Sequence, residues 1–425
     1  MKNTGEKKKF HYAWLILISC CAIQAGGAGT LVNSAGVFFP EVSKSLGVGV
    51  GDFSFYFTIT YIALALALPF AGKLFPKFNI RVLLSSAIII CNLCVIAMSR
   101  FTATWQWYVA GGILGLAGAF IFIITTPIIL GNWFEKKLGL ATGIGMAFNG
   151  VGGAIINPIL SSSITNLGWR NAYLVMAGIS LVLILPFTLF VIKFKPEDMG
   201  LKPYGHEELE EENSSNDIAS YGVSEKEAIR SKAFMMMFIA FGLTGFLTGY
   251  SQQLPAFADS INFPATLGAM LVSISLLVSV CGKLVLGELN DRFGIKKITI
   301  YGMGIAIFAF CLLIFSNGNF TMVLLGSSLY GITQTINAVA VPLITKKAFG
   351  YKDYSSIYSK LAVGQNLIGA FGFSAVGFIY DITGSYTPSF TLGAILCVTF
   401  LVLVLSGLAS AKKLDSNDNE LSLAS

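Results

Sequence analysis

Long apolar runs separated by short polar segments repeat along the whole chain. An α-helix needs about 20 apolar residues to cross a bilayer core roughly 30 Å thick, and twelve runs reach or approach that length. The pattern therefore predicts an all-α integral membrane protein with twelve transmembrane helices. The runs are Tyr12–Phe38, Phe53–Ala71, Val82–Met98, Trp107–Leu130, Leu138–Thr165, Ala172–Ile192, Ala233–Pro255, Leu267–Leu289, Ile298–Phe315, Phe320–Ile344, Tyr354–Tyr380 and Thr387–Leu408.

The longest polar segment divides these runs into two groups of six. It covers 195–232 and contains an acidic cluster at 207–212, a composition typical of a linker without a packed core. The polar end of the chain has the same character and is expected to be disordered. The expected organisation is an N-terminus at 1–11, a six-helix bundle at 12–194, a linker at 195–232, a second six-helix bundle at 233–410 and a tail at 411–425.

The two groups of six resemble repeats of one unit. The segment Gly72–Arg81 after the second run and the segment Gly287–Lys296 after the eighth align without gaps. When this alignment is extended along the chain, Pro127 and Pro342 fall at equivalent positions. Two pseudo-symmetric six-helix bundles with a substrate near the membrane midplane are a recurrent transporter plan, in which the bundles rock against each other.

Composition and charge agree with a membrane protein. The chain of 425 residues is 55% hydrophobic, only 12% charged and has a mean hydropathy of +0.74, which is too apolar for a soluble protein. Of its 28 Lys and Arg residues, 23 fall in the segments on one side of the predicted membrane, three in the loops on the other side and two inside apolar runs. This asymmetry predicts that both ends are cytoplasmic. It also explains the net charge of +6 without a nucleic-acid partner.

Two lysines lie inside apolar runs, and no acidic residue lies deep in any run. Lys283 falls in the run Leu267–Leu289 and Lys360 in the run Tyr354–Tyr380. An ammonium group in hydrocarbon is costly and usually faces a cavity or a partner. Because the runs supply no carboxylate, the sequence favours an anion from outside as the partner. The alternative for each lysine is that it extends to the membrane surface, and this alternative is stronger for Lys360, near the start of its run.

Polar side chains inside the runs form a second tier of candidates. Each could orient a carboxylate, and each could equally serve as a hydrogen bond between helices. Gln24, Tyr61, Gln334 and Gln365 are the better candidates because their predicted depth is near the midplane. The complete set of predicted substrate-binding residues is Lys283, Lys360, Gln24, Tyr61, Gln334, Gln365, Asn33, Asn149 and Tyr250.

Nothing in the chain points to catalysis or to a cofactor. Both histidines, His11 and His206, lie outside the apolar runs, and no phosphate-binding loop is present. All seven cysteines fall in apolar runs and are interpreted as packing residues, including the Cys91–Cys94 pair. We expect no metal, no cofactor and no enzyme activity, and we expect a monomer in the bilayer.

The paired loops resemble the motif of the major facilitator superfamily, Gly-x-x-x-Asp-(Arg/Lys)-x-Gly-x-(Arg/Lys). The second copy matches at Gly287, Asp291 and Arg292, whereas the first has Pro76 at the acidic position and Asn79 at the second glycine. The resemblance implies a gating role for Gly287, Asp291 and Arg292. An acid beside a helix end can hold a neighbouring helix through charge and hydrogen bonds.

Further motifs resemble the bacterial oxalate:formate antiporters and the related monocarboxylate transporters. They are His11–Trp14, Gly36–Pro40, Asn132–Gly143, Gly168–Arg170 and Lys195–Gly205.

This resemblance assigns the position of Lys283 to a substrate-binding arginine, and Lys360 matches a lysine that the antiporters use. Monocarboxylate transporters have an acid where this chain has Ser279 and a lysine where it has Asn33. Both departures argue against their proton-coupled mechanism.

Together these observations predict a secondary active transporter of small organic anions, either mono- or dicarboxylates, in a bacterial inner (plasma) membrane. An intramembrane lysine would pair with the substrate carboxylate, and transport would proceed by exchange or by ion-coupled alternating access. The second partner is a counter-transported carboxylate or a proton. The alternatives are a multidrug or hydrophobic-solute exporter of the same fold and a membrane sensor. The exporter usually needs an intramembrane acid, which the apolar runs lack.

Overall fold

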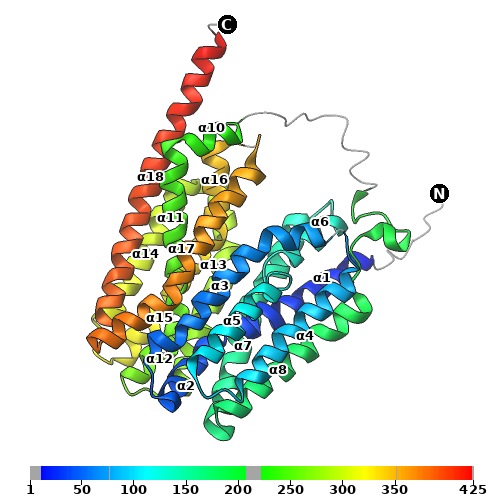
Figure 1. The fold of residues 1–425 in the computed structure, drawn as a ribbon. Helices are drawn as coiled ribbons and strands as arrows, with labels where there is room; N and C mark the ends of the chain where they lie inside the picture. Colours follow the sequence, from blue (N-terminus) through cyan, green and yellow to red (C-terminus); the bar gives the residue numbers. More distant parts are fainter. Residues whose placement is uncertain (1–10, 76, 207–221, 351, 424–425) are drawn as a thin grey trace, which may run out of the picture.

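The computed structural model describes residues 11–75, 77–206, 222–350 and 352–423 and is helical through almost all of them. Two bundles of helices stand side by side, and both described ends of the chain lie at the same end of the molecule (Figure 1). We call this end the termini end, and the opposite end, which carries α2 and α12, the far end. The acidic cluster expected at 207–212 lies outside the described residues.

The first bundle is built from the N-terminal half of the chain. Its elements are α1 (Tyr12–Gln24), the π-helix η1 (Ala25–Val32), η2 (Ala35–Phe38), α2 (Phe39–Leu46), α3 (Val50–Leu74), α4 (Ile80–Met98), α5 (Thr104–Gly118), α6 (Thr125–Trp133), α7 (Leu138–Leu167), α8 (Trp169–Pro186) and η3 (Phe187–Val191).

The linker and the second bundle follow. Their elements are η4 (Pro196–Met199), α10 (Glu225–Arg230), α11 (Lys232–Thr248), α12 (Tyr250–Ser260), α13 (Ala265–Phe293), α14 (Ile295–Ile314), α15 (Phe320–Thr335), the π-helix η5 (Ile336–Ala340), α16 (Val341–Phe349), α17 (Tyr354–Thr383) and α18 (Thr387–Leu423).

Equivalent helices of the two bundles keep the offset seen in the sequence. The spacing between the starts of α3 and α13 equals the spacing between Gly72 and Gly287, and so does the spacing between the starts of α4 and α14. α7 and α17 both have 30 residues, and their starts depart from this spacing by a single position. The repeat inferred from two short loops therefore extends over whole helices.

Ten helices in the described part of the chain are long and apolar enough to cross a membrane. The other two predicted spans, Trp107–Leu130 and Phe320–Ile344, are interrupted at matching places. The first is divided between α5 and α6, and the second changes to the π-helix η5 between α15 and α16. Each interruption precedes a proline, Pro127 or Pro342, which cannot donate a backbone hydrogen bond to the preceding turn.

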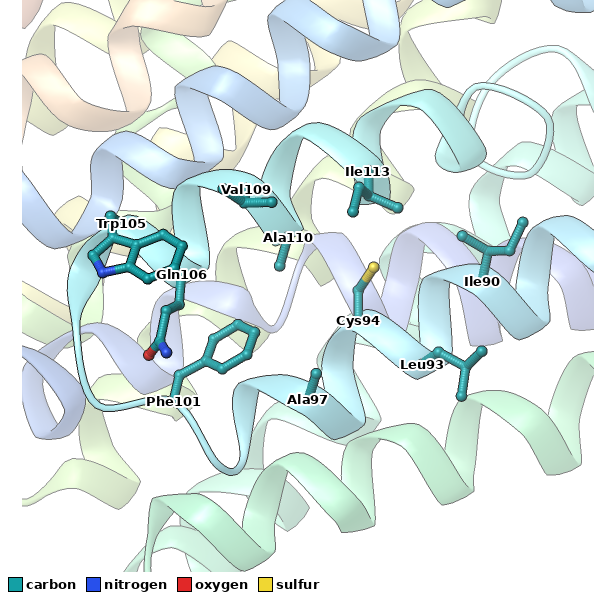
Figure 2. A pocket seen from close by; sticks show the side chains of 10 residues that line it. All are labelled: Ile90, Leu93, Cys94, Ala97, Phe101, Trp105, Gln106, Val109, Ala110 and Ile113. Atoms are coloured by element: carbon teal, nitrogen blue, oxygen red, sulfur yellow. The ribbon is translucent and has the colours of Figure 1, made fainter.

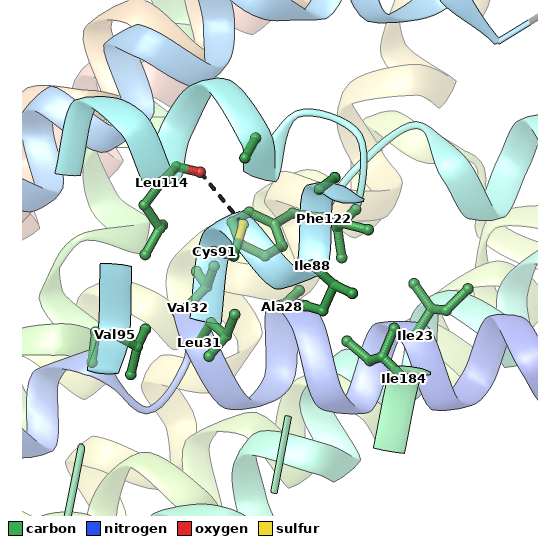
Figure 3. Packing of buried hydrophobic residues seen from close by; sticks show 14 of the residues in the cluster. Ile23, Ala28, Leu31, Val32, Ile88, Cys91, Val95, Leu114, Phe122 and Ile184 are labelled. Carbon is green, nitrogen blue, oxygen red and sulfur yellow. Dashed lines mark hydrogen bonds between the residues drawn. The ribbon is translucent and has the colours of Figure 1, made fainter. Parts of the chain in front are cut away.

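Each bundle has its own apolar core. One cluster of buried side chains runs from Ala13 to Ile192 with Ala269 and Phe373 added, and the other draws almost entirely on the second bundle. Figure 3 shows part of the first core, where the Sγ of Cys91 lies 3.9 Å from the carbonyl oxygen of Leu114. Cys91 is thus a buried packing residue, as the sequence predicted.

Three of the family-like motifs meet at the termini end of the first bundle. Tyr204 of the linker packs against His11, Trp14 and Phe134, with ring centroids 5.5, 5.5 and 5.6 Å away. The Tyr204 carbonyl also accepts the backbone N–H groups of Glu135 and Lys136 at 3.1 Å. These motifs therefore anchor the start of the linker to the bundle.

The end of the chain differs from the prediction. The segment from Ala411 was expected to be disordered, but α18 continues as a helix to Leu423. The last glycine is Gly407, and no proline follows it. Without either residue, the segment contains no strong helix breaker to end α18 at the edge of the bundle.

Candidate functional site

The two bundles are joined at the far end by hydrogen bonds between α3 and α17 and between α12 and the η1–η2 segment. Thr58 Oγ1 of α3 donates to the Ala370 carbonyl of α17 at 2.8 Å. Gln252 of α12 accepts the Gly36 N–H at 2.7 Å and donates to the Val32 carbonyl at 3.1 Å. These bonds are buried and link elements from opposite halves of the chain, so they seal this end.

The carboxylate of Asp381 caps a helix of the other bundle. It lies at the far end of α17 and accepts the backbone N–H groups of Val50 and Gly51 at 2.9 and 2.7 Å. These are unsatisfied donors at the start of α3, where a negative charge is favourable. A second cross-bundle pair joins Lys44 and Asp259 at 2.7 Å.

Helices α3 and α17 touch at the far end and separate toward the termini end. A β-carbon at Gly51 would lie 2.3 Å from the Phe378 backbone nitrogen, so the two backbones are in direct contact there. Further along, the rings of Tyr61 and Phe373 pack against each other with centroids 4.5 Å apart and planes inclined at 33°. Beyond this aromatic pair the helices are separated by a cavity.

The cavity has a volume of about 770 Å³ and lies between the bundles. Its wall is largely apolar with a few amide, hydroxyl and phenol groups, as in many small-molecule sites. Among the described lining residues, Lys360 is the one charged side chain, and none is acidic. The lining is Tyr61, Ala65, Leu68, Pro69, Ile123, Ile124, Met146, Gly245, Thr248, Asn337, Ala338, Tyr358, Ser359, Lys360, Ala362, Val363, Gln365, Asn366, Gly369 and Phe373.

Both interrupted helices border this cavity. Ile123 precedes α6 and Ala338 belongs to η5, and the two residues occupy equivalent positions in the repeat. Each stands four residues before a proline, so its carbonyl receives no helical hydrogen bond from that residue. Irregular backbone at membrane depth is tolerated where it lines a cavity.

Lys360 has an ion-pair partner in the linker, a contact that no local pattern in the sequence predicts. Its ammonium group forms an ion pair with Glu225, the first residue of the linker helix α10. The Lys360 ammonium, together with the hydroxyl of Ser356, holds the pKa of the Glu225 carboxyl below its ordinary value. Both side chains are accessible to solvent, so the ion pair lies at the edge of the cavity and is not buried.

Lys283 lies where the two bundles part. On α13 it shares one helical face with Leu276 and Val280. These two side chains pack against glycines of α7. A β-carbon at Gly153 would lie 2.8 Å from Leu276, and one at Gly150 would lie 2.6 Å from Val280. Two turns nearer the termini end, a β-carbon at Gly143 would meet nothing within 4 Å. Lys283 is half-buried at the end of this contact. It is absent from the cavity lining and has no ion-pair partner in the described chain.

Gln365 and Asn337 form the central polar pair of the cavity. The Gln365 amide donates to the Asn337 side-chain oxygen at 2.7 Å and to its carbonyl at 3.3 Å. In the same bundle, the amide nitrogen of Gln334 and the hydroxyl of Ser279 are buried without a hydrogen-bond partner in the described structure. Of the predicted binding residues, Tyr61, Gln365 and Lys360 thus line the cavity. Gln334 precedes the lining residue Asn337 in the sequence.

Four other predicted residues make contacts inside or between helices. Gln24 donates to Thr126 at 3.0 Å, and its own oxygen is buried without a partner in the described chain. Asn33 donates to the Asn149 carbonyl at 3.0 Å. Tyr250 is buried in the second core and donates to the Ser389 carbonyl at 2.5 Å. Gln24, Asn33, Asn149 and Tyr250 are not among the residues that line the cavity.

The predicted gating residues lie at the termini end of α13. The side chains of Gly287 and Asp291 lie outside the described part of the structure. Arg292 is exposed and pairs with Glu288 of its own helix at 2.5 Å. The gating role therefore stays a prediction.

Comparison with known sequences decides the family. The sequence profile of the Major Facilitator Superfamily matches residues 18–316 and 254–423. The chain belongs to this superfamily. It is a multi-pass membrane transporter and not an enzyme.

Relatives and solved structures agree with this assignment. Monocarboxylate transporter 13 of Rattus norvegicus is 22% identical over 95% of this chain and 91% of its own length. Monocarboxylate transporter 12 of Mus musculus is 22% identical over 68% of this chain, which spans 64% of that relative's length. A mutant of the nucleoside transporter NupG superimposes with a TM-score of 0.73 at 16% identity, covering 94% of this chain and 99% of its own. The last likeness concerns the fold alone.

Proposed function

We propose that this transporter carries small organic anions, most readily monocarboxylates with an apolar body. The observation that carries the proposal is the charge of the cavity: its described lining contains one lysine, Lys360, and no carboxylate. An apolar wall with a single cation suits a solute that has one negative group and a hydrocarbon part. The names of the monocarboxylate transporters among the relatives point the same way.

The Lys360–Glu225 ion pair supports exchange of partners during transport. When no substrate is bound, Glu225 neutralises Lys360 at the edge of the cavity. A substrate carboxylate that enters from the termini end takes the place of Glu225, and the lysine is never left without a counter-charge. Because both side chains are accessible to solvent, the Lys360–Glu225 pair is weak, and a substrate carboxylate can displace Glu225 at little cost.

Lys283 is the second cation of the proposed mechanism. It stands half-buried at the line where α7 and α13 part, without a partner in the described chain. Closing the termini end would bring α7 against it and desolvate its ammonium group. A bound anion would offset that cost, so loaded carriers close more readily than empty ones. This behaviour favours exchange of carboxylates, with the termini on the cytoplasmic side of a bacterial inner membrane.

Counterflow in proteoliposomes tests the proposal. Vesicles preloaded with unlabelled lactate, pyruvate, formate or oxalate receive the labelled acid, with wild type beside Lys360→Gln, Lys283→Gln and the exposed control Lys347→Gln. Hydrogen bonds to charged groups contribute about 1.5–3 kcal/mol. The Lys360→Gln and Lys283→Gln substitutions are therefore each expected to raise the half-saturating concentration by about tenfold or more, and the control is expected to match wild type.

Two results would overturn the proposal. Counterflow that survives both substitutions would remove the lysines from substrate binding. Absence of counterflow with every acid, together with accumulation of an apolar cation, would favour the hydrophobic-solute exporter, which the apolar cavity wall also suits.

A further inference from the structure

A groove on the outer surface of the first bundle has no role in the transport cycle proposed above. It lies between α4 and α5, has a volume of about 450 Å³ and is separate from the cavity between the bundles. Figure 2 shows its lining, which is Ile90, Leu93, Cys94, Ala97, Phe101, Trp105, Gln106, Val109, Ala110 and Ile113. Several of these side chains are well exposed, including Leu93, Trp105 and Val109.

The groove runs through most of one leaflet of a bilayer. Along α4 it extends from Ile90 to Ala97, which corresponds to about 11 Å at 1.5 Å per residue, and Phe101 continues its lining beyond the end of the helix. Half of a hydrocarbon core roughly 30 Å thick is about 15 Å. The groove ends at the helix boundaries of the far end, where Trp105 occupies the level that tryptophans prefer at a membrane surface.

Positive charge gathers at this end of the groove. Of the three basic residues between the predicted spans at the far end, Lys44 is paired with Asp259, and the other two, Arg100 and Arg170, lie beside Phe101. Arg170 donates to the Phe101 carbonyl at 3.3 Å, and Arg100 adjoins Phe101 in sequence. Both arginines are exposed, and neither has a carboxylate partner in the described chain.

An amide donor completes the arrangement. The Gln106 side-chain oxygen accepts the backbone N–H groups of Thr102 and Ala103 at 2.7 and 3.0 Å. This contact fixes the amide, whose NH₂ group has no partner in the described structure. Figure 2 places the Gln106 amide next to Phe101, at the charged end of the groove.

We propose that the α4–α5 groove is a binding site for an anionic phospholipid of the far-end leaflet. One acyl chain would fill the groove from Phe101 toward Ile90. The headgroup phosphate would lie between Arg100 and Arg170 and accept a hydrogen bond from Gln106. Guanidinium groups suit this role because they bind phosphate oxygens in pairs.

Native mass spectrometry of the full chain in detergent, titrated with phosphatidylglycerol and phosphatidylcholine of equal chain length, tests the proposal. We expect one retained phosphatidylglycerol and a preference of about fivefold for each arginine that contacts the lipid. Ala97→Phe fills the groove and should abolish retention, whereas Ala409→Phe places the same ring on an exposed position of α18 and should not.

Arg100→Gln gives an independent readout, because an exposed arginine can be replaced without filling the groove. It should reduce the preference for phosphatidylglycerol by about fivefold and leave phosphatidylcholine binding unchanged. Equal binding of the two lipids by wild type would overturn the proposal, as would retention that neither variant alters. A lipid-free dimer cross-linked through the groove would also overturn it, since a second copy would then occupy the site.

Discussion

Helices α3 and α17 form a tight contact at one end of the molecule and the walls of a cavity at the other. At the far end they meet through small residues, because Gly51 lies against Gly377 and Thr58 bonds to Ser374 at 2.9 Å. Toward the termini end the facing residues are larger, including Leu68 and Tyr358. Small side chains let helix backbones approach closely, so the position of the glycines decides which end is sealed.

The two ends also differ in how they use charge. At the far end, Asp381 and the Lys44–Asp259 pair connect one bundle to the other. At the termini end, Lys360 pairs with Glu225 of the linker helix, and Lys283 has no partner in the described chain. The charged groups named at the far end therefore all have partners, whereas a cation at the termini end is available to bind a further anion.

The largest effect is expected from Gly51→Ala, which adds a methyl group where α3 and α17 are in direct backbone contact. The new β-carbon would lie 2.3 Å from a backbone nitrogen, which cannot move aside as a flexible side chain would. Overpacking costs about 1–3 kcal/mol, so the sealed state should lose about fivefold or more in population. Counterflow should fall, and amide exchange at the start of α3 should accelerate. Gly178→Ala is the matched control, because its β-carbon would meet nothing within 4 Å.

Asp381→Asn should weaken the far-end seal to a smaller extent. Asparagine has the same shape as aspartate but lacks the negative charge that accepts hydrogen bonds from two backbone N–H groups. Loss of a helix cap destabilises a helix by about 1 kcal/mol. Hydrogen–deuterium exchange of the first turn of α3 should increase about fivefold. Glu41→Gln removes a negative charge from the same end and should leave that exchange unchanged; an equal response of both variants would show a general charge effect.

Glu225→Gln should remove the ion-pair partner of Lys360 at the termini end and so leave both Lys360 and Lys283 without an ion-pair partner in the described chain, against the paired charges of the far end. Exposed ion pairs are weak, so carboxylate affinity in counterflow should rise by a few-fold, up to about fivefold. Because the pKa of Glu225 is lowered, the pair persists above the ordinary carboxyl pKa and is lost only as pH falls through the lowered value. The effect of the substitution should therefore stay constant between about pH 6 and 8. A reduced affinity would contradict competition between Glu225 and the substrate.

Lys44→Gln should have the smallest effect. The Lys44 side chain in the Lys44–Asp259 pair is 58% exposed, and solvent screens such pairs. The expected change in the far-end contact is at most about 1 kcal/mol at low salt and less at high salt. Counterflow measured over a range of salt concentrations checks this expectation. A large, salt-independent loss of activity would assign Lys44 a role beyond this ion pair.

Much of the fold could be predicted from the spacing of apolar residues. The apolar runs coincide with the helices because a bilayer leaves backbone groups no partners except those inside a helix. The constant offset between the halves, first seen in two loops and two prolines, recurs in the starts of α3 and α13. The interruptions before Pro127 and Pro342 were not predicted, because an apolar run continues through both of them and its composition does not change.

The candidate site was only partly predictable. Of the predicted binding residues, Tyr61, Gln365 and Lys360 line the cavity, whereas Gln24 and Tyr250 make contacts elsewhere. Depth within a run can be estimated from residue number, but the side of the helix that meets the cavity depends on how the bundles pack. This explains why residues of similar predicted depth have different surroundings.

The sequence by itself determined that the chain spans a membrane, that it is built from two related halves and that it carries two lysines inside apolar runs. These properties follow from local composition and spacing. Only the tertiary structure decided that Glu225 pairs with Lys360, far away in the sequence, and that Asp381 caps a helix of the other bundle. Such contacts depend on the relative placement of two bundles, which no local pattern of residues encodes.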